Sequence, residues 1–125
     1  MQTRVRPASS SSRAPCATFS WPGATRKAGL EVISEDYIQH NTEIGDGRKA
    51  VADMLRRDDP RLVNLQIHRL CAQENFVAVL SEAILGDSPY AQGDLFRVDH
   101  GMIVEHWNLA EAIAPKEKWA NTGKF

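Results

Sequence analysis

The sequence has little cysteine and no long apolar run. Its two cysteines, Cys16 and Cys71, are too few for a disulfide framework, so we expect free thiols in a reducing compartment. No stretch approaches the roughly 18 consecutive apolar residues of a membrane span, so we expect no membrane partner. The 125 residues suffice for one domain, and a composition of 42% hydrophobic and 25% charged residues is typical of globular proteins.

Several motifs for ligands and catalysis are also absent. The sequence has no HxH, HExxH or CxxC spacing that would hold a metal ion. It has no GxGxxG or GxxxxGK[ST] loop for phosphate and no GxSxG serine elbow. We therefore expect a protein that works without a metal or another cofactor.

Acidic residues are missing from the start of the chain. The net charge is −1, but the first carboxylate is Glu31, and all 16 acidic residues lie from there onward. An acidic body disfavours binding to a phosphate backbone, so we expect no nucleic acid partner. Before Glu31 there are five of the 15 basic residues, namely Arg4, Arg6, Arg13, Arg26 and Lys27.

Residues 1–29 have the composition of a segment outside the folded domain. They mix Ser, Pro, Gly and Arg without an apolar period, so they cannot bury enough surface to fold alone. An Arg- and Ser-rich start without acids is typical of an organellar transit peptide, but a disordered tail or a misassigned translation start fits equally. We expect a domain over residues 30–125 in the cytoplasm, with a mitochondrial location as the alternative.

The domain begins with helical spacing and continues with alternation. Apolar residues three and four apart predict a short helix over 30–41, and residues 43–60 predict a second helix, capped by Asp46 and ended by Pro60. Strands are predicted over 62–72, 76–85, 94–98 and 102–113, with a loop over 86–93. This order favours an α+β fold, in which helices pack on one face of a curved antiparallel sheet.

The last two predicted strands place polar groups on an apolar face. Alternation puts Asp94 beside Phe96, and it puts Val104, His106 and Asn108 together on the next strand. A tight turn at 99–101 pairs the strands, so Asp94 can meet His106 or Asn108 across the hairpin. A carboxylate against an imidazole can supply a base, although a structural pair or a solvated Asp94 at a strand start would leave the same pattern.

His40 and Asn41 lie at the predicted end of the first helix. Both residue types are common where helices terminate, so one interpretation is that His40 and Asn41 only end the helix. The other interpretation places them at the polar rim of the cavity that Asp94 and His106 would enter.

Five stretches occur in the order found in a known family: "YIQHN" (37–41), "DGRKAV" (46–51), "DLFRV" (94–98), "GMIVEHWN" (101–108) and "ANTGKF" (120–125). From Tyr37 to Phe125 the chain resembles the SnoaL-like polyketide cyclase family, part of the nuclear-transport-factor-2-like (NTF2-like) superfamily of α+β cones. The resemblance implies a deep pocket against a curved sheet, with Asp94 as the acid/base and His106 and position 108 lining the pocket. It also implies His40 near the mouth and a homodimer formed through the sheet.

The sequence departs from the family pattern at three places. Thr42 stands where the family has proline, and Asn108 stands where it has aspartate. An amide cannot exchange a proton at neutral pH, which questions acid/base duty at position 108. The long first helix that closes the cone is not recognisable in residues 1–29, so the predicted cone has a missing or atypical first helix.

Together these observations predict a small-molecule enzyme of the cyclase or isomerase kind. Asp94 would remove a proton next to a carbonyl, in an aldol cyclisation or an isomerisation, and His106 would orient it or bind the enolate. The alternative is a non-catalytic ligand-binding or dimerisation module with a relic pocket. The residues expected to contact a small apolar, carbonyl-containing ligand are Tyr37, His40, Asn41, Phe96, Val104 and Asn108.

Overall fold

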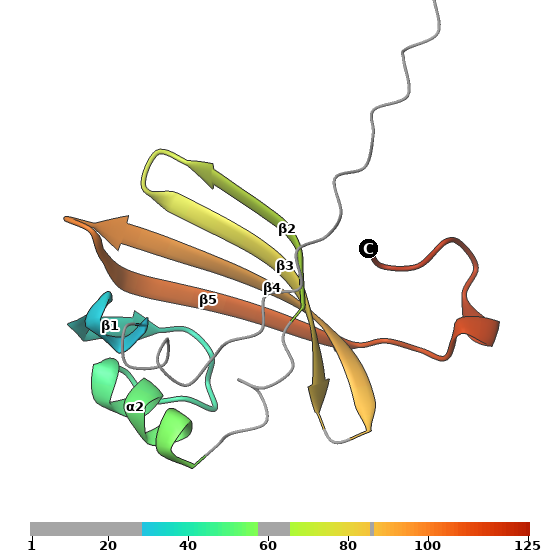
Figure 1. Cartoon of the computed structure of the whole chain (residues 1–125), viewed down its shortest axis with the longest axis horizontal. Coiled ribbons are helices and arrows are strands. Elements are labelled where there is room, and N and C mark those ends of the chain that lie inside the picture. The colour runs from blue at the N-terminus through green and yellow to red at the C-terminus, as the bar shows by residue number, and fades with distance from the viewer. Residues whose placement is uncertain (1–28, 58–65, 86) are drawn as a thin grey trace, which may run out of the picture.

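The computed structural model describes residues 29–57, 66–85 and 87–125. Predictions that concern residues 1–28, Pro60 and Leu65 therefore lie outside the described residues. The described elements follow one another from a strand and a helix to four further strands (Figure 1). They are β1 (Ile33–Gln39), α2 (Arg48–Arg56), β2 (Gln66–Gln73), β3 (Phe76–Leu85), β4 (Ser88–Asp99), β5 (Met102–Ala112) and the 3-10 helix η2 (Lys116–Lys118).

The five strands form one curved sheet in the order β1-β5-β4-β3-β2 (Figure 1). Neighbours from β2 to β5 pair antiparallel, as expected for hairpins joined by turns of about two residues. At the far edge β1 pairs parallel with β5, so the sheet is mixed and not wholly antiparallel as predicted. The α+β class predicted from the sequence is confirmed, with α2 packed against β1.

The prediction of a helix over residues 30–41 is wrong, because residues 33–39 form strand β1. Periodicity alone cannot separate a short helix from a short strand when few apolar residues are present. The backbone groups of this segment find their partners on β5, and the pairing shifts register between Ile33 and Ile38. That irregularity disturbs the two-residue alternation which would otherwise have identified the strand.

The predicted loop over residues 86–93 is also shorter in the structure. Strand β4 starts at Ser88 and pairs with β3 from its first residue, where Leu85 faces Ser88. Proline and glycine in "SPYAQG" favoured a loop, but the segment pairs with β3 from Ser88 onward and with β5 from Tyr90 onward. Strand β4 therefore begins six residues before Asp94, and Asp94 lies in its interior and not at its start.

The two faces of the sheet differ sharply in burial. We call the face with Asp94 and His106 the inner face, and the face with Glu105 and Trp107 the outer face. On the outer face large apolar side chains are exposed, and Leu109 is 81% accessible. The described core therefore lies on the inner side, where the buried strand residues are Tyr37, Ser81, Ala83 and Gln92.

Gly47, and not Asp46, precedes helix α2. Its backbone lies at φ 84° and ψ 154°, a region that residues with a side chain rarely enter. In this conformation its N–H donates to the Tyr37 carbonyl at 2.7 Å, which ties the helix start to β1. The Asp46 carboxylate, which was expected to cap the helix, instead accepts a hydrogen bond from the Gln39 backbone N–H at 2.7 Å.

We predict that Gly47→Ala destabilises the domain by about 1–3 kcal/mol, because alanine resists this backbone conformation. Its Cβ would also lie 3.1 Å from the Glu35 carbonyl oxygen. Urea denaturation at pH 7 measures the change. Gly93→Ala is the matched control, since a Cβ there meets nothing within 4 Å, and its stability should change by less than about 1 kcal/mol. Equal stability of the two variants would contradict the role assigned to Gly47.

Candidate active site

Asp94, His106 and Asn108 meet on the inner face. The register sets Asp94 directly opposite Asn108, and it sets Phe96 opposite His106. The Asn108 amide Nδ2 donates to Asp94 Oδ1 at 2.8 Å, and His106 Nε2 lies 2.8 Å from the same oxygen. The side chains of His106 and Asp94 are only 11% and 15% exposed, so this is a nearly buried carboxylate–imidazole contact.

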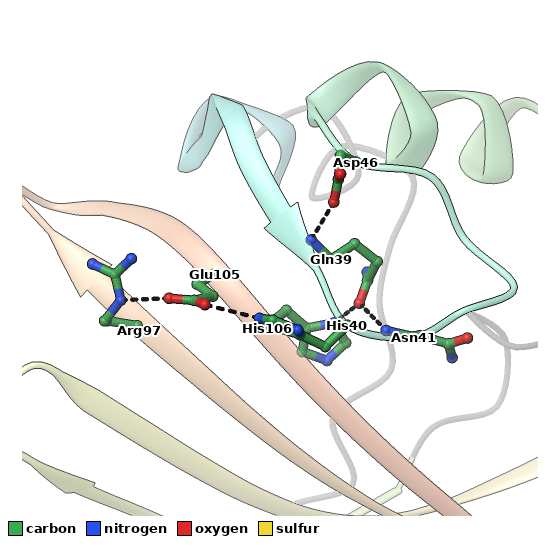
Figure 2. A network of polar contacts seen from close by, with 7 residues as sticks. All are labelled: Gln39, His40, Asn41, Asp46, Arg97, Glu105 and His106. Carbon is green, nitrogen blue, oxygen red and sulfur yellow. Dashed lines mark hydrogen bonds and ion pairs between the residues drawn. The ribbon is translucent and has the colours of Figure 1, made fainter.

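Strand β1 contributes Gln39 to the cluster formed by Asp94, His106 and Asn108. The Gln39 carbonyl oxygen Oε1 lies 3.0 Å from His106 Nδ1, and it also accepts the Asn41 backbone N–H at 3.0 Å (Figure 2). The amide nitrogen of Gln39 donates to the Tyr37 hydroxyl oxygen at 3.2 Å. Both ring nitrogens of His106 are thereby in contact with side chains of the protein.

Asn41 connects β1 to the far side of the cluster. Its Nδ2 donates to Asn108 Oδ1 at 3.3 Å, and its own Oδ1 accepts the Glu43 backbone N–H at 3.0 Å. Parallel pairing of β1 with β5 makes these contacts possible, because it brings Gln39 level with His106. The loop after β1 therefore holds Asn108 in place.

Aromatic rings surround the His106 imidazole. Phe96 stacks on it with ring centroids 4.6 Å apart, and Tyr37 lies nearly parallel at 6.3 Å. Burial raises the pKa of Tyr37 well above its ordinary value. The hydrogen bond from Gln39 acts in the opposite direction, and the negative charge of Asp94 raises the pKa further. The Tyr37 hydroxyl thus keeps its proton over the whole physiological range and remains a possible donor.

His40 lies on the outer face, away from Asp94. Its Nε2 is 2.8 Å from Glu105 Oε1 (Figure 2). Its ring also stacks on Trp107, with ring centroids 4.7 Å apart. Arg97 Nε donates to the other oxygen of Glu105 at 2.7 Å. The sequence offered His40 as part of a polar cavity rim at a predicted helix end, and the family resemblance implied a place near the cavity mouth. On a strand, alternation turns it to the face opposite Gln39 and Asn41.

Of the other predicted site residues, Tyr37, Asn41, Phe96 and Asn108 are brought together around His106. Val104 is half-buried at the bulge where the β4–β5 register shifts. Gln39 was not singled out from the sequence, although it contacts His106. Its position two residues before Asn41 would have indicated a shared face had the segment been predicted as a strand.

We predict that Glu105→Gln destabilises the domain at pH 7 and that the difference from the wild type becomes smaller in acid. The hydrogen bonds from His40 and then Arg97 hold the pKa of Glu105 below its ordinary value. A carboxyl group whose pKa is lowered by folding stabilises the protein above its unfolded pKa of about 4.3, and this stabilisation is lost as the pH falls through the folded value. Urea midpoints at pH 7 and pH 3 measure the difference between variant and wild type.

The control for this change is Glu111→Gln, which removes a carboxylate paired with Lys124 at the surface. Exposed pairs contribute little, so its midpoint should stay close to that of the wild type at both pH values. A midpoint for Glu105→Gln that equals the wild type at pH 7 would show that the Arg97–Glu105–His40 cluster adds no net stability.

A groove of about 830 Å³ lies elsewhere, lined by residues of β3, β4 and β5 and by the C-terminal segment. Leu109, Glu111 and Trp119 are among its lining residues, whereas Asp94 and His106 are not. Within the described part of the chain, no cluster of three or more His, Cys, Asp or Glu side chains is arranged to hold a metal ion. No described helix has both the length and the hydropathy that crossing a bilayer requires.

Neither a family model nor a curated protein matches this sequence. Solved structures do match its fold. An NTF-2 like protein of unknown function from Burkholderia xenovorans LB400 is 16% identical, with a TM-score of 0.60 over 78% of this chain and 82% of that one. A putative ketosteroid isomerase from Kribbella flavida DSM 17836 is 21% identical, with a TM-score of 0.60 over 82% and 81%.

The protein has the NTF2-like fold. A third structure agrees with this assignment: a putative polyketide cyclase from Bacillus cereus ATCC 10987 is 16% identical, with a TM-score of 0.55 over 73% of this chain and 66% of that one. The fold predicted from the motifs between Tyr37 and Phe125 is therefore confirmed. Identities this low leave the activity to be argued from the site itself.

Proposed function

We propose that this NTF2-like protein is a small-molecule enzyme that moves a proton next to a carbonyl group. The observation that carries the proposal is the contact of 2.8 Å between Asp94 and His106, both largely buried on the inner face. A carboxylate in such a place has partners that hold it in position and little water to compete with a substrate. Similar folds include a putative polyketide cyclase and a steroid delta-isomerase, which makes carbonyl chemistry a reasonable class.

In the proposed reaction Asp94 takes the proton from the carbon next to the carbonyl. The electron pair of the broken C–H bond moves onto the carbonyl oxygen and forms an enolate. Both nitrogens of His106 already contact Gln39 and Asp94, so His106 orients the carboxylate and does not reach the substrate oxygen. Donors for that oxygen are the Tyr37 hydroxyl, which accepts from Gln39 and retains its own proton, and the second amide hydrogen of Asn108.

The substrate class follows from the walls around this group. Phe96 and Tyr37 present rings on either side of the imidazole, and Val104 adds an aliphatic side chain nearby on β5. A small, mostly apolar molecule with one carbonyl suits such a lining, since a few polar groups fix its orientation. Proton transfer of this kind requires no cofactor.

The test is exchange of the protons next to the carbonyl in small cyclic ketones and 1,3-diketones. In D2O, NMR would follow loss of the proton signal with and without the protein. Exchange that is faster than in buffer and saturates with ketone concentration supports the proposal. Saturable binding of the same ketones without exchange or product would overturn it and favour the non-catalytic ligand-binding module.

We also propose that two copies associate through the outer face. Leu109 and Leu95 are exposed there, with Phe76 and Ile38 on neighbouring strands. Exposed large apolar side chains gathered on one face of a sheet, here beside the Arg97–Glu105–His40 cluster, are characteristic of an interface between protein chains. Sedimentation equilibrium gives the mass directly: a dimer supports the proposal, and a monomer at high concentration contradicts it.

A further inference from the structure

We infer that Gln39 is a positioning residue that decides where protons reside on Asp94 and His106. The two side chains then form one acid–base couple that holds a single shared proton. The mechanistic consequence rests on the proposed function, whereas the location of the protons rests on hydrogen-bond geometry alone. No comparison with known proteins assigns a role to Gln39.

The first step concerns the orientation of the Gln39 amide. The Asn41 backbone N–H can only donate, so the Gln39 atom 3.0 Å from it must be the carbonyl oxygen Oε1. A carbonyl oxygen can only accept. Because the same oxygen lies 3.0 Å from His106 Nδ1, that nitrogen must carry a hydrogen. The second bond of this amide, from its nitrogen to the Tyr37 hydroxyl, agrees with the orientation.

The second step fixes the other neighbour of Asp94 by the same reasoning. The Glu43 backbone N–H donates to Asn41 Oδ1, so the remaining amide atom of Asn41 is the nitrogen that donates to Asn108 Oδ1. Asn108 must then present its nitrogen to Asp94 Oδ1 at 2.8 Å. The backbone N–H groups of Asn41 and Glu43, just after β1, thus fix which amide atoms of Gln39 and Asn108 face the His106–Asp94 contact.

The third step counts protons between Asp94 and His106. With Nδ1 protonated, a neutral His106 has a lone pair on Nε2, and a lone pair cannot face a carboxylate oxygen at 2.8 Å without repulsion. The contact therefore contains a proton, either on Asp94 with a neutral imidazole or on Nε2 as an ion pair. Both forms have the same net charge, and neither leaves an isolated charge on the inner face.

With this arrangement, Asp94 can both accept a proton from the substrate and return it. In the ion-pair form the Asp94 carboxylate accepts the proton from the substrate carbon, and in the return step the same carboxyl group releases it to a carbon or an oxygen. The number of protons on the enzyme is restored after each turnover. Such a couple suits isomerisations and aldol reactions, in which the proton removed from the substrate carbon is given back to the product.

The test is the ¹⁵N NMR spectrum of the His106 ring in protein labelled at histidine, with His106→Asn used to assign the signals. In the wild type, Nδ1 is expected to show the shift and coupling of a protonated nitrogen throughout the pH range in which the domain is folded. Gln39→Leu removes the acceptor, so the ring should change to the neutral form with hydrogen on Nε2 and a lone pair on Nδ1. Gln39→Glu keeps an acceptor and should restore the protonated Nδ1 signal.

Gln73→Leu is the matched control, because this exposed glutamine ends β2 at the opposite edge of the sheet and should leave the spectrum unchanged. An unprotonated Nδ1 in the wild type, or no change in Gln39→Leu, would overturn the inference. If Gln39→Leu fails to fold, the wild-type spectrum alone decides. The spectrum needs no substrate, so protonated Nδ1 without any ketone exchange would remove the proposed function and leave the proton placement standing.

Discussion

Asp94→Asn is expected to lower the rate of ketone proton exchange by about 10²–10⁴-fold, the usual contribution of a general acid or base. The amide has nearly the same shape and can still accept from Asn108, but it cannot take up a proton at neutral pH. The fold is expected to persist with reduced stability, because an amide at position 94 supplies neither the proton nor the negative charge of the contact with His106. Exchange rates by NMR, together with the urea midpoint, separate the loss of chemistry from a loss of structure.

The matched control is Asp99→Asn, at the end of the same strand. Asp99 is exposed, and its carboxylate forms an ion pair with the neighbouring His100. Its variant should exchange ketone protons at the wild-type rate. If Asp94→Asn gains stability and keeps its exchange rate, the carboxylate is a structural group, and the proposed chemistry is wrong.

Tyr37→Ala is expected to lower the free energy of unfolding by about 3–5 kcal/mol, the range for removing a large buried ring. Tyr37 is 4% exposed, lies beside the His106 ring and offers its backbone carbonyl to Gly47. Tyr37→Phe keeps the ring and loses only the hydroxyl that accepts from Gln39, so it should cost about 1 kcal/mol at pH 7. Urea denaturation of the three proteins measures the ring and the hydroxyl separately.

The stability of the wild type and of Tyr37→Phe at alkaline pH tests the burial of the Tyr37 hydroxyl independently. Burial raises the pKa of Tyr37 above the unfolded value of about 10, so folding favours the protonated phenol. This stabilisation is complete below pH 10 and is lost as the pH rises toward the folded pKa. Tyr37→Phe should therefore lose less stability than the wild type between pH 9 and pH 11. An identical pH dependence in Tyr37→Phe and the wild type would contradict the assignment.

The hairpin of β4 and β5 explains why the centre of the site could be predicted. Its turn is short and its residues alternate, so the register follows from the local sequence within a residue or two. Asp94 was expected to meet His106 or Asn108, and the structure brings it to both. Such contacts span only 12 to 14 residues, and few other arrangements of the hairpin are compatible with the apolar pattern.

The error at residues 30–41 had consequences beyond one element. Interpreted as a helix, the segment offered His40 and Asn41 as neighbours at a cavity rim. Folded as a strand, it turns His40 to Glu105 on the outer face and turns Gln39 and Asn41 to the inner cluster. Because successive residues of a strand point to opposite faces, the assignment of this segment to a strand decides which polar side chains reach His106.

The sequence by itself determined the class of fold, the four consecutive strands and the pairing of Asp94 with its neighbours on β5, because those features depend on short hairpins and local alternation. Only the tertiary structure decided that residues 33–39 extend beside β5, that Gln39 contacts His106 and that Asn41 contacts Asn108. These contacts join residues 67 positions apart in the chain. A parallel strand pair has no connecting turn to fix its register, so its stability depends on packing and on a ladder of hydrogen bonds that no short stretch of sequence encodes.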